Sequence, residues 1–329
     1  MLRISHSQDA EGHWQLHIDD NWDISHEVLG PCGPSNCDYL ESVTPDWSGL
    51  IWFSTENGVV GTIDPETRAV HSVRLPAGER VANSISSSPE GVAVPSDHAL
   101  YLFSSGLNGT PTVLWREVYD RGTRTKLGRL SQGTGSTPVF FGREGHPYLA
   151  ITDNGDSQER LLVYLVNARA PKRLVRKIPL FSPGASADEN APIGIGDSVV
   201  LSNTFGYDSN NFTGRELQPL PGGLTRIDVR PDRSGCDVVW TNPVSSAAVP
   251  KLSIADGDIY TVKRALVGST PQYLFCAIDF RTGETVVEKL IGGAYALDAF
   301  QLAGVIGPNG VLDQPTISGI IQVRPGTGK

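Results

Sequence analysis

Short clusters of carboxylate and amide side chains follow apolar runs at several places in the sequence. Asp153 and Asn154 come directly after the apolar run 148–152, and a second acidic cluster occupies 188–190. Such oxygens could bind a hard cation such as Ca²⁺ or contact a polar ligand. They could equally accept hydrogen bonds from backbone N–H groups within a turn. Both interpretations stay open for both clusters.

A lysine and several aromatic residues lie near the ends of other apolar runs. Lys251 begins such a run, where burying its charge is costly unless Asp153 or Glu189 pairs with it. Both structural pairing and catalysis fit this position. Aromatic side chains near the same openings could pack inside the protein or line a pocket for an apolar ligand; they are Trp22, Trp47, Phe205, Tyr207, Tyr295 and Phe300.

Composition and missing motifs exclude several function classes. The formal net charge of -9 argues against binding to nucleic acid or to an anionic membrane. No apolar run is long enough to span a membrane. There is no Gly-x-Ser-x-Gly motif and no glycine-rich nucleotide fingerprint. Cysteine and histidine spacing also does not fit a zinc site.

Cysteines and glycosylation sequons favour a secreted or secretory-pathway protein whose leader is absent from this sequence. Cys32 and Cys37 flank a short Pro/Gly-rich loop that a disulfide could close, and unpaired surface thiols are the alternative. Asn108 and Asn211 each begin an Asn-x-Thr sequon. A cytosolic protein is the other interpretation.

The elements that must position these residues are short strands. Gly (36) and Pro (23) are frequent, and β-branched and aromatic runs alternate with turns. A four-strand pattern recurs, with innermost strands beginning near 42, 83, 136, 190, 250 and 297. The sixth unit, 297–324, is one strand short, and the strand-like run 13–18 could complete it.

The chain 1–329 is therefore predicted to be one all-β domain, a six-bladed β-propeller closed by its N-terminal strand. Tandem β-sandwiches are the alternative, but they do not explain the missing strand. A propeller gathers residues near its inner strands around a central funnel, which would bring the polar and aromatic residues above together.

Several sequence segments resemble those of a family of fungal and actinobacterial propellers with quinoprotein-like (PQQ-like) repeats. The segments are 132–138, 151–154, 186–190, 202–207, 249–253 and 277–283. The family label does not imply bound PQQ. The fold is also similar to the gluconolactonase group, in which carboxylates and amides hold a divalent metal. The sequence departs from the family's usual pattern at 202–205 and 294–298, where apolar and aromatic residues replace an Asn-rich segment.

Three candidate functions follow, of which the resemblance implies the first two. The first is that of the fungal hetero-Diels–Alderases, which join a tropolone o-quinone methide to a humulene-type sesquiterpene without a cofactor or metal. Lys251, Asp153 and Asn154 would then be catalytic, and a hydrophobic substrate would contact Trp47, Asn83, Glu189, Asn190, Phe205, Tyr207, Tyr295 and Phe300.

The second is a lactonase-like hydrolase with a divalent cation such as Ca²⁺ in the funnel, held by Glu41, Asn83, Asp153 and Glu189. The third is a propeller that binds a ligand without catalysis. The architecture alone does not choose among them.

Overall fold

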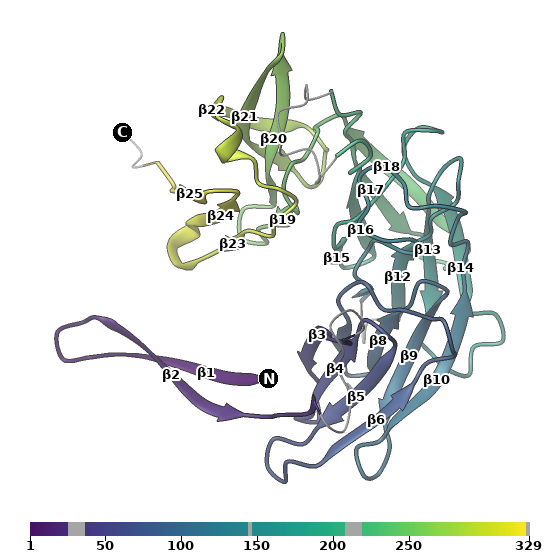
Figure 1. Ribbon diagram of the computed structural model, residues 1–329. Coiled ribbons are helices and arrows are strands. Elements are labelled where there is room, and N and C mark those ends of the chain that lie inside the picture. Colours follow the sequence, from purple (N-terminus) through teal and green to yellow (C-terminus); the bar gives the residue numbers. More distant parts are fainter. Residues whose placement is uncertain (26–36, 144–146, 208–218, 327–329) are drawn as a thin grey trace.

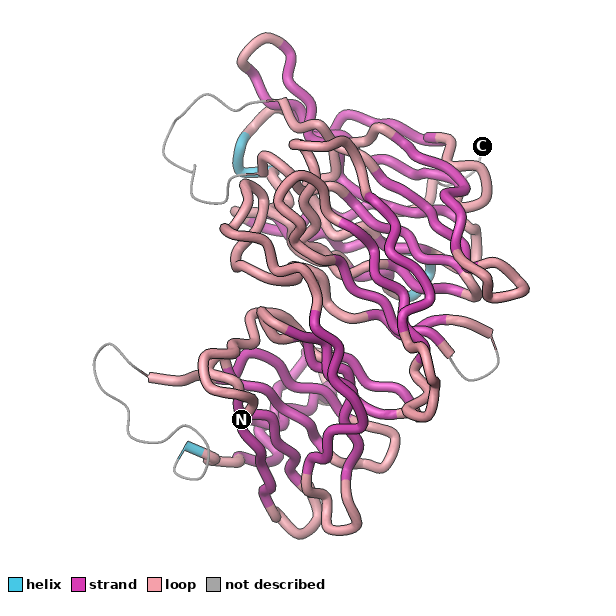
Figure 2. Tube along the Cα trace, turned by 90° about the vertical axis from the view of Figure 1, so that its right-hand side faces the viewer, coloured by secondary structure: helices cyan, strands magenta, loops and turns pink. Residues whose placement is uncertain are grey.

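Antiparallel sheets make up almost the whole of the protein. We describe a computed structural model of residues 1–25, 37–143, 147–207 and 219–326. These residues form strands, loops, two short 3₁₀ turns, η2 (Tyr295–Leu297) and η3 (Pro308–Gly310), and one π-helical residue, Ser25, and contain no α-helix (Figure 2). None of the described segments is a helix that could cross a membrane. The predicted all-β class is confirmed.

Six sheets follow one another along the chain, and five of them have four strands (Figure 1). The first three are β3–β6 (Leu40–Pro45, Ile51–Thr55, Val59–Ile63, Val70–Arg74), β7–β10 (Ser86–Ser88, Gly91–Pro95, Ala99–Ser105, Pro111–Val118) and β11–β14 (Val139–Phe141, Tyr148–Thr152, Arg160–Leu165, Leu174–Pro179). The others are β15–β18 (Ile193–Ile195, Ser198–Ser202, Leu224–Val229, Cys236–Asn242), β19–β22 (Lys251–Leu252, Asp258–Val267, Thr270–Asp279, Thr285–Gly292) and the three-stranded β23–β25 (Val305–Ile306, Leu312–Thr316, Gly319–Val323).

The hydrophobic core lies between neighbouring sheets, as in a β-propeller. Leu149 and Leu162 of the third sheet pack with Leu100 and Leu102 of the second. The other face of the third sheet packs on the fourth, and comparable clusters join the first to the second and the fourth to the fifth. Strands such as β12 and β16 are consequently buried along their whole length and apolar at their centres.

The predicted closure by the N-terminal strand is wrong. Residues 13–18 belong largely to β2 (Trp14–Asn21), which pairs with β1 (Leu2–Gln8) in a separate hairpin. The last sheet keeps three strands, and Figure 1 shows the hairpin on the open side of the arc, between the first and sixth sheets. The sequence interpretation missed β1. A partner six residues away closes a much shorter loop than one three hundred residues away, and so costs less entropy.

A second correction concerns the start of the sixth unit. An inner strand was expected over 297–305, but this stretch holds the end of η2, a loop and only the first residue of β23. Phe300 and Gln301 adopt φ angles of 51° and 53°. Strands cannot continue through this left-handed backbone region. The loop instead crosses toward the inner strands of the fourth and fifth sheets, where Gln301 N donates to Ala247 O at 2.7 Å.

The cysteines and sequons lie in different surroundings. Cys37 is disulfide-bonded; Cys32 lies outside the described residues, so its pairing with Cys37 stays a prediction. Cys236 and Cys276 are free and buried, as expected. Asn108 is exposed in a turn, and Asn211 lies outside the described residues.

Candidate functional site

A pocket of about 250 Å³ lies where connections from several sheets meet near the inner strands. One wall comes from the connection that leads into the third sheet, and another from the loop that leads into the sixth. The remaining contacts precede the second and fourth sheets or follow β16. Its lining residues are Asn83, Gly128, Arg129, Leu130, Glu189, Tyr207, Phe300, Gln301 and Leu302.

Glu189 is the carboxyl group of this pocket, and its side chain is only 8% exposed. Among the described residues, neither of its carboxylate oxygens meets a donor with the distance and angle of a hydrogen bond. The nearest charge is Arg129, whose Nε lies 3.7 Å from Oε2. Burial raises the pKa of Glu189 to about 7, although Arg129 and the backbone N–H of Leu130 oppose this rise.

Arg129 is held in place behind Glu189. Its side chain is fully buried, with Nη1 donating to the carboxylate of Glu159 and Nη2 donating to Gly133 O. Its Nε has no hydrogen-bond partner in the described part of the protein. The guanidinium is thus fixed by its two outer nitrogens, while its Nε–H lies beside Glu189 without an acceptor among the described residues.

Buried carboxyl groups outnumber the cations around this guanidinium. Glu159 and Asp188 are fully buried beside Arg129, and Lys126 Nζ lies 3.7 Å from Glu159. Burial raises the pKa of Glu159 to about 7 and that of Asp188 well above its usual value. Burial also lowers the pKa of Lys126. Near neutral pH the carboxyl groups of this cluster can therefore bind or release protons while they stay buried.

The two aromatic residues that line the pocket, Tyr207 and Phe300, are both hydrogen-bonded to one buried aspartate. Asp298 accepts hydrogen bonds from the hydroxyl of Tyr207, the hydroxyl of Tyr273 (2.9 Å) and the backbone N–H of Phe300 (2.9 Å). The guanidinium of Arg264 stacks 4.8 Å from the Tyr207 ring centre. Burial raises the pKa of Tyr207, so its hydroxyl stays protonated. Tyr207 and Phe300 are rigid surfaces of the pocket.

Of the residues expected to bind substrate, Asn83, Glu189, Tyr207 and Phe300 come together around this pocket. Asn190 lies just behind it: its Nδ2 donates to Gln301 Oε1 and to Ser202 Oγ, each at 2.8 Å. Their role in binding remains a prediction, but the structure places them around one pocket.

Asp153 and Asn154, expected to be catalytic, each use one polar atom to hold neighbouring backbone in place. Asp153 Oδ1 accepts hydrogen bonds from the backbone N–H groups of Gly155 (3.2 Å) and Arg160 (2.8 Å). Asn154 Nδ2 donates to the carbonyls of Arg121 and Arg124, both at 2.9 Å. Both residues are buried and lie outside the pocket. These contacts fit the turn interpretation, while Asp153 Oδ2 and Asn154 Oδ1 accept no hydrogen bond from the described residues. A catalytic role for the two residues stays a prediction.

Lys251 borders a different pocket, formed with Ile193 and Leu252 among others. Burial lowers its pKa. It makes no ion pair with Asp153 or Glu189, whose ion-pair partners among the described residues are Arg160 and Arg129.

The other expected aromatic contacts point elsewhere. Trp47 is 73% exposed on the loop between β3 and β4. Phe205 lines a separate pocket of about 340 Å³ with Lys126 and Ser186, and Tyr295 lies in η2. None of the three belongs to the pocket that contains Glu189.

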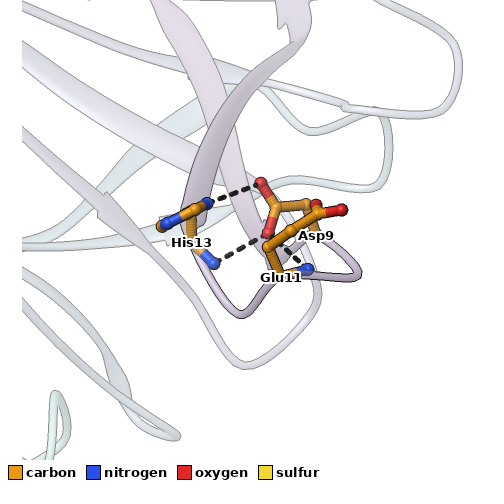
Figure 3. A group of neighbouring side chains, drawn as sticks. All are labelled: Asp9, Glu11 and His13. Atoms are coloured by element: carbon orange, nitrogen blue, oxygen red, sulfur yellow. Dashed lines mark hydrogen bonds and ion pairs between the residues drawn. The ribbon is translucent and has the colours of Figure 1, made fainter.

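The carboxylates expected to bind a metal do not form one cluster. Within the described ranges, the single group of three ligand-type side chains is Asp9, Glu11 and His13, at the turn of hairpin β1–β2 (Figure 3). Asp9 Oδ1 already accepts hydrogen bonds from the backbone N–H groups of Glu11 (3.1 Å) and His13 (2.8 Å). These contacts stabilise the turn. Glu41 lies near Glu56, on the first sheet.

Sequence reasoning missed Arg129 and Gln301, the polar residues that complete the pocket. One signal was available for the arginine. The predicted funnel held several carboxylates and needed a buried cation, which was assigned to Lys251. Arg129 precedes the phrase 132–138 by only three residues. No local pattern marks Gln301, because its position depends on the loop that replaces the expected strand.

Comparisons with known proteins support the fold. No protein-family profile matches the sequence. A curated but uncharacterised protein of Archaeoglobus fulgidus is 24% identical over 319 residues, which covers 86% of this chain and 60% of that protein. The chain thus spans about 60% of the length of this relative.

Several solved propellers superpose on most of the chain. The β-propeller domain of Myceliophthora thermophila Cps50 (Swd1) has a TM-score of 0.54 at 11% identity, covering 98% of this chain and 94% of that one. The WD40 propeller of Doa1 gives 0.53 at 10% identity, covering 96% and 83%. A protein of Bacteroides uniformis, provisionally assigned as a 6-phosphogluconolactonase, gives 0.53 at 14% identity, covering 87% and 81%. The chain has the β-propeller fold, and these identities establish no more than the fold.

Proposed function

We propose that the protein hydrolyses a small cyclic ester in the pocket around Glu189, by general acid–base catalysis. The observation that carries this proposal is a buried carboxyl group that lines a pocket, has a pKa of about 7, and has two oxygens that meet no donor among the described residues at hydrogen-bond distance and angle. A general base works best when its pKa lies near the working pH. Perturbed carboxyl groups in pockets are candidates for such a role.

The reaction balances with groups already in the pocket. The carboxylate of Glu189 takes a proton from a water molecule while the water oxygen bonds to the ester carbonyl carbon. The Nε–H of Arg129 donates a hydrogen bond to the carbonyl oxygen as it gains negative charge. The ring C–O bond then breaks, and the leaving oxygen takes the proton back from Glu189. The product is an open hydroxy acid.

The size of the pocket favours a small substrate. Pockets for drug-sized ligands measure roughly 300–1,000 Å³, and this one is about 250 Å³. Tyr207, Phe300 and Leu302 would contact the apolar face of a ring, and Asn83 could bind a hydroxyl group. The fold shared with the provisionally assigned lactonase is compatible with this chemistry.

The cycloaddition implied by the family resemblance is not favoured by any contact. A sesquiterpene and a tropolone derivative held together need more room than this pocket offers. The residues expected to polarise the reactants, Lys251, Asp153 and Asn154, also lie outside it. Binding without catalysis is the remaining alternative and is an outcome of the test below.

Glu189→Gln tests the proposal with a panel of simple γ- and δ-lactones. We expect the unmodified protein to open at least one of them, with kcat/KM rising as the pH increases through about 7, because the basic form of Glu189 is the active one. The variant should lose roughly 100-fold or more of this activity. Glu66→Gln, an exposed carboxyl group on the first sheet, is the matched control. Equal activity of Glu189→Gln and Glu66→Gln, or binding of a lactone without turnover, would contradict the proposal.

A further inference from the structure

The N-terminal hairpin β1–β2 presents an apolar face that no described residue covers. Large side chains from both strands point to the same side because the register pairs Ile4 with Ile18 and His6 with Leu16. The exposed fractions of these side chains lie between 51% and 77%. We call this strip the hairpin face; its apolar members are Leu2, Ile4, Trp14, Leu16 and Ile18. Exposed apolar strips of this kind usually mark an interaction site.

The hairpin is held firmly at its base. Met1 and Trp22 exchange two hydrogen bonds, from the terminal ammonium to Trp22 O (2.7 Å) and from Trp22 N to Met1 O (2.9 Å). Arg68 of the first sheet donates to Asp20 Oδ1 (2.6 Å) and to Asn21 O (2.7 Å). Trp22 itself is buried on that sheet. The hairpin face is therefore presented in a fixed orientation, which reduces the entropy lost on binding.

Charge is separated between the two faces of the hairpin. By the pairing register, Arg3, Asp20 and His17 lie on the side opposite Ile4, Leu16 and Ile18. The hairpin face has no Asp, Glu, Lys or Arg among its cross-strand pairs. Two copies of a chain with a net charge of -9 repel one another at most surfaces. Two copies that met at the hairpin face would place no Asp, Glu, Lys or Arg of its cross-strand pairs opposite one another.

From these observations we infer that the hairpin face is a symmetric dimer interface, on which the hairpin of a second copy of this chain stacks. A two-fold axis brings the same patch of both copies together, so a flat apolar strip is its own complement. Covering a Leu or Ile side chain removes on the order of 100 Å² from water. Two facing strips of five side chains then bury about 1,000 Å², which is the size at which specific interfaces begin.

The sixth sheet of the same chain is a less suitable occupant. Its outward side carries Val305 and Ile320, but Asp313 and Gln322 lie between them and are joined by a hydrogen bond of 2.7 Å. Stacking the hairpin face there would cover these polar groups. Packing within one chain remains an outcome of the test.

Sedimentation velocity over a range of protein concentrations tests the inference with paired variants. The unmodified chain should form a dimer, and Leu16→Asp should raise the dimer dissociation constant at least tenfold, because two carboxylates would then meet at the axis. His17→Asp, on the opposite face of the same strand, should leave it unchanged. Mixing Leu16→Asp with Leu16→Lys should restore association, since only a mixed pair then places opposite charges in contact.

Three results would overturn the inference. One is an unmodified chain that stays monomeric at every concentration. Another is a dimer that Leu16→Asp leaves intact, since it would use another surface. The third is a Leu16→Asp chain that melts at a clearly lower temperature than His17→Asp at a concentration where both are monomers, since that would place the hairpin face against its own chain. Thermal melts of all three variants therefore accompany the sedimentation runs.

Discussion

At the scale of single residues, the molecule concentrates its unusual chemistry around Arg129. Glu159 and Glu189 have pKa values of about 7 in the folded state because they are buried, whereas an ordinary glutamate titrates near 4.5. Folding therefore binds protons in the interval between these values. The stability that these groups contribute is complete below about pH 4.5 and is lost as the pH rises through about 7.

We accordingly expect the free energy of unfolding to be lower at pH 8 than at pH 5.5, by on the order of 2 kcal/mol for each group. Glu189→Gln should remove part of this pH dependence, because an amide at this position has no proton to lose. Urea unfolding at the two pH values measures the difference, with Glu66→Gln as the control. A variant with the same pH dependence as the unmodified protein would show that Glu189 does not titrate in this range.

Individual residues were predicted unevenly from the sequence. Glu189, Tyr207 and Phe300 were identified because each follows or precedes an apolar run, and strand ends meet around a funnel. Asp153 looked equally promising, yet its Oδ1 is used by two backbone donors and its Oδ2 lies 3.5 Å from the Nε of Arg160. A sequence does not show which carboxylates have their oxygens occupied, since that depends on where distant N–H groups arrive.

At the scale of elements, the connection from β10 to β11 determines the shape of the pocket. Gly128 in this connection has a φ angle of +90°, and a Cβ there would overlap the carbonyl oxygen of Thr204. The hydroxyl of Thr204 in turn donates to Gly128 O at 2.8 Å. This close backbone contact brings Arg129 and Leu130 against the loop that follows β16. Only glycine fits the position.

Gly128→Ala should therefore destabilise the protein and displace Arg129 from Glu189. Gly257→Ala is a matched control, because Gly257 has a similar φ of +80° but open space where the Cβ would lie. We expect the control to cost about 1 kcal/mol from backbone strain alone, and Gly128→Ala to cost about 1–2 kcal/mol more. Thermal unfolding compares the two. Equal losses would mean that the contact with Thr204 relaxes freely.

Strands were easier to predict than the loops between them. Inner strands were expected to begin near 42, 136, 190 and 250, and they begin at Leu40, Val139, Ile193 and Lys251. Alternation and turn residues are local signals, so the sequence carries them directly. The stretch 297–305 was taken for a strand because its apolar residues resemble one. Its left-handed residues are fixed by contacts with Asp298, Asn190 and Ala247, all of them tertiary.

At the scale of the whole molecule, the six sheets form an arc whose two ends differ from its middle. The third sheet has a packed neighbour on both faces, whereas the sixth has exposed apolar residues and only three strands. The blade count was predictable because each unit repeats a local pattern. The ring closure was not, since strand pairing over the full chain length competes with the local hairpin.

Amide hydrogen exchange should be slower in the middle of the arc than at its two ends. We expect the slowest exchange in β12, β13 and β16, whose residues are buried on both faces, and the fastest in β1, β2 and β25. Mass spectrometry of peptides from the exchanging protein measures the exchange rate of each strand. The protein concentration is kept below the range in which the chain dimerises. Uniform protection along the chain would show that the ends are as tightly packed as the middle.

The two sulfur atoms at Cys236 and Cys276 give the fourth and fifth blades a built-in reporter. Burial raises their pKa values to about 11 and 12, so neither is nucleophilic while its blade is intact. A maleimide added to the native protein would react with each thiol only after the blade that contains it has opened. The lag before each peptide gains the label would then time the opening of one blade independently of the other.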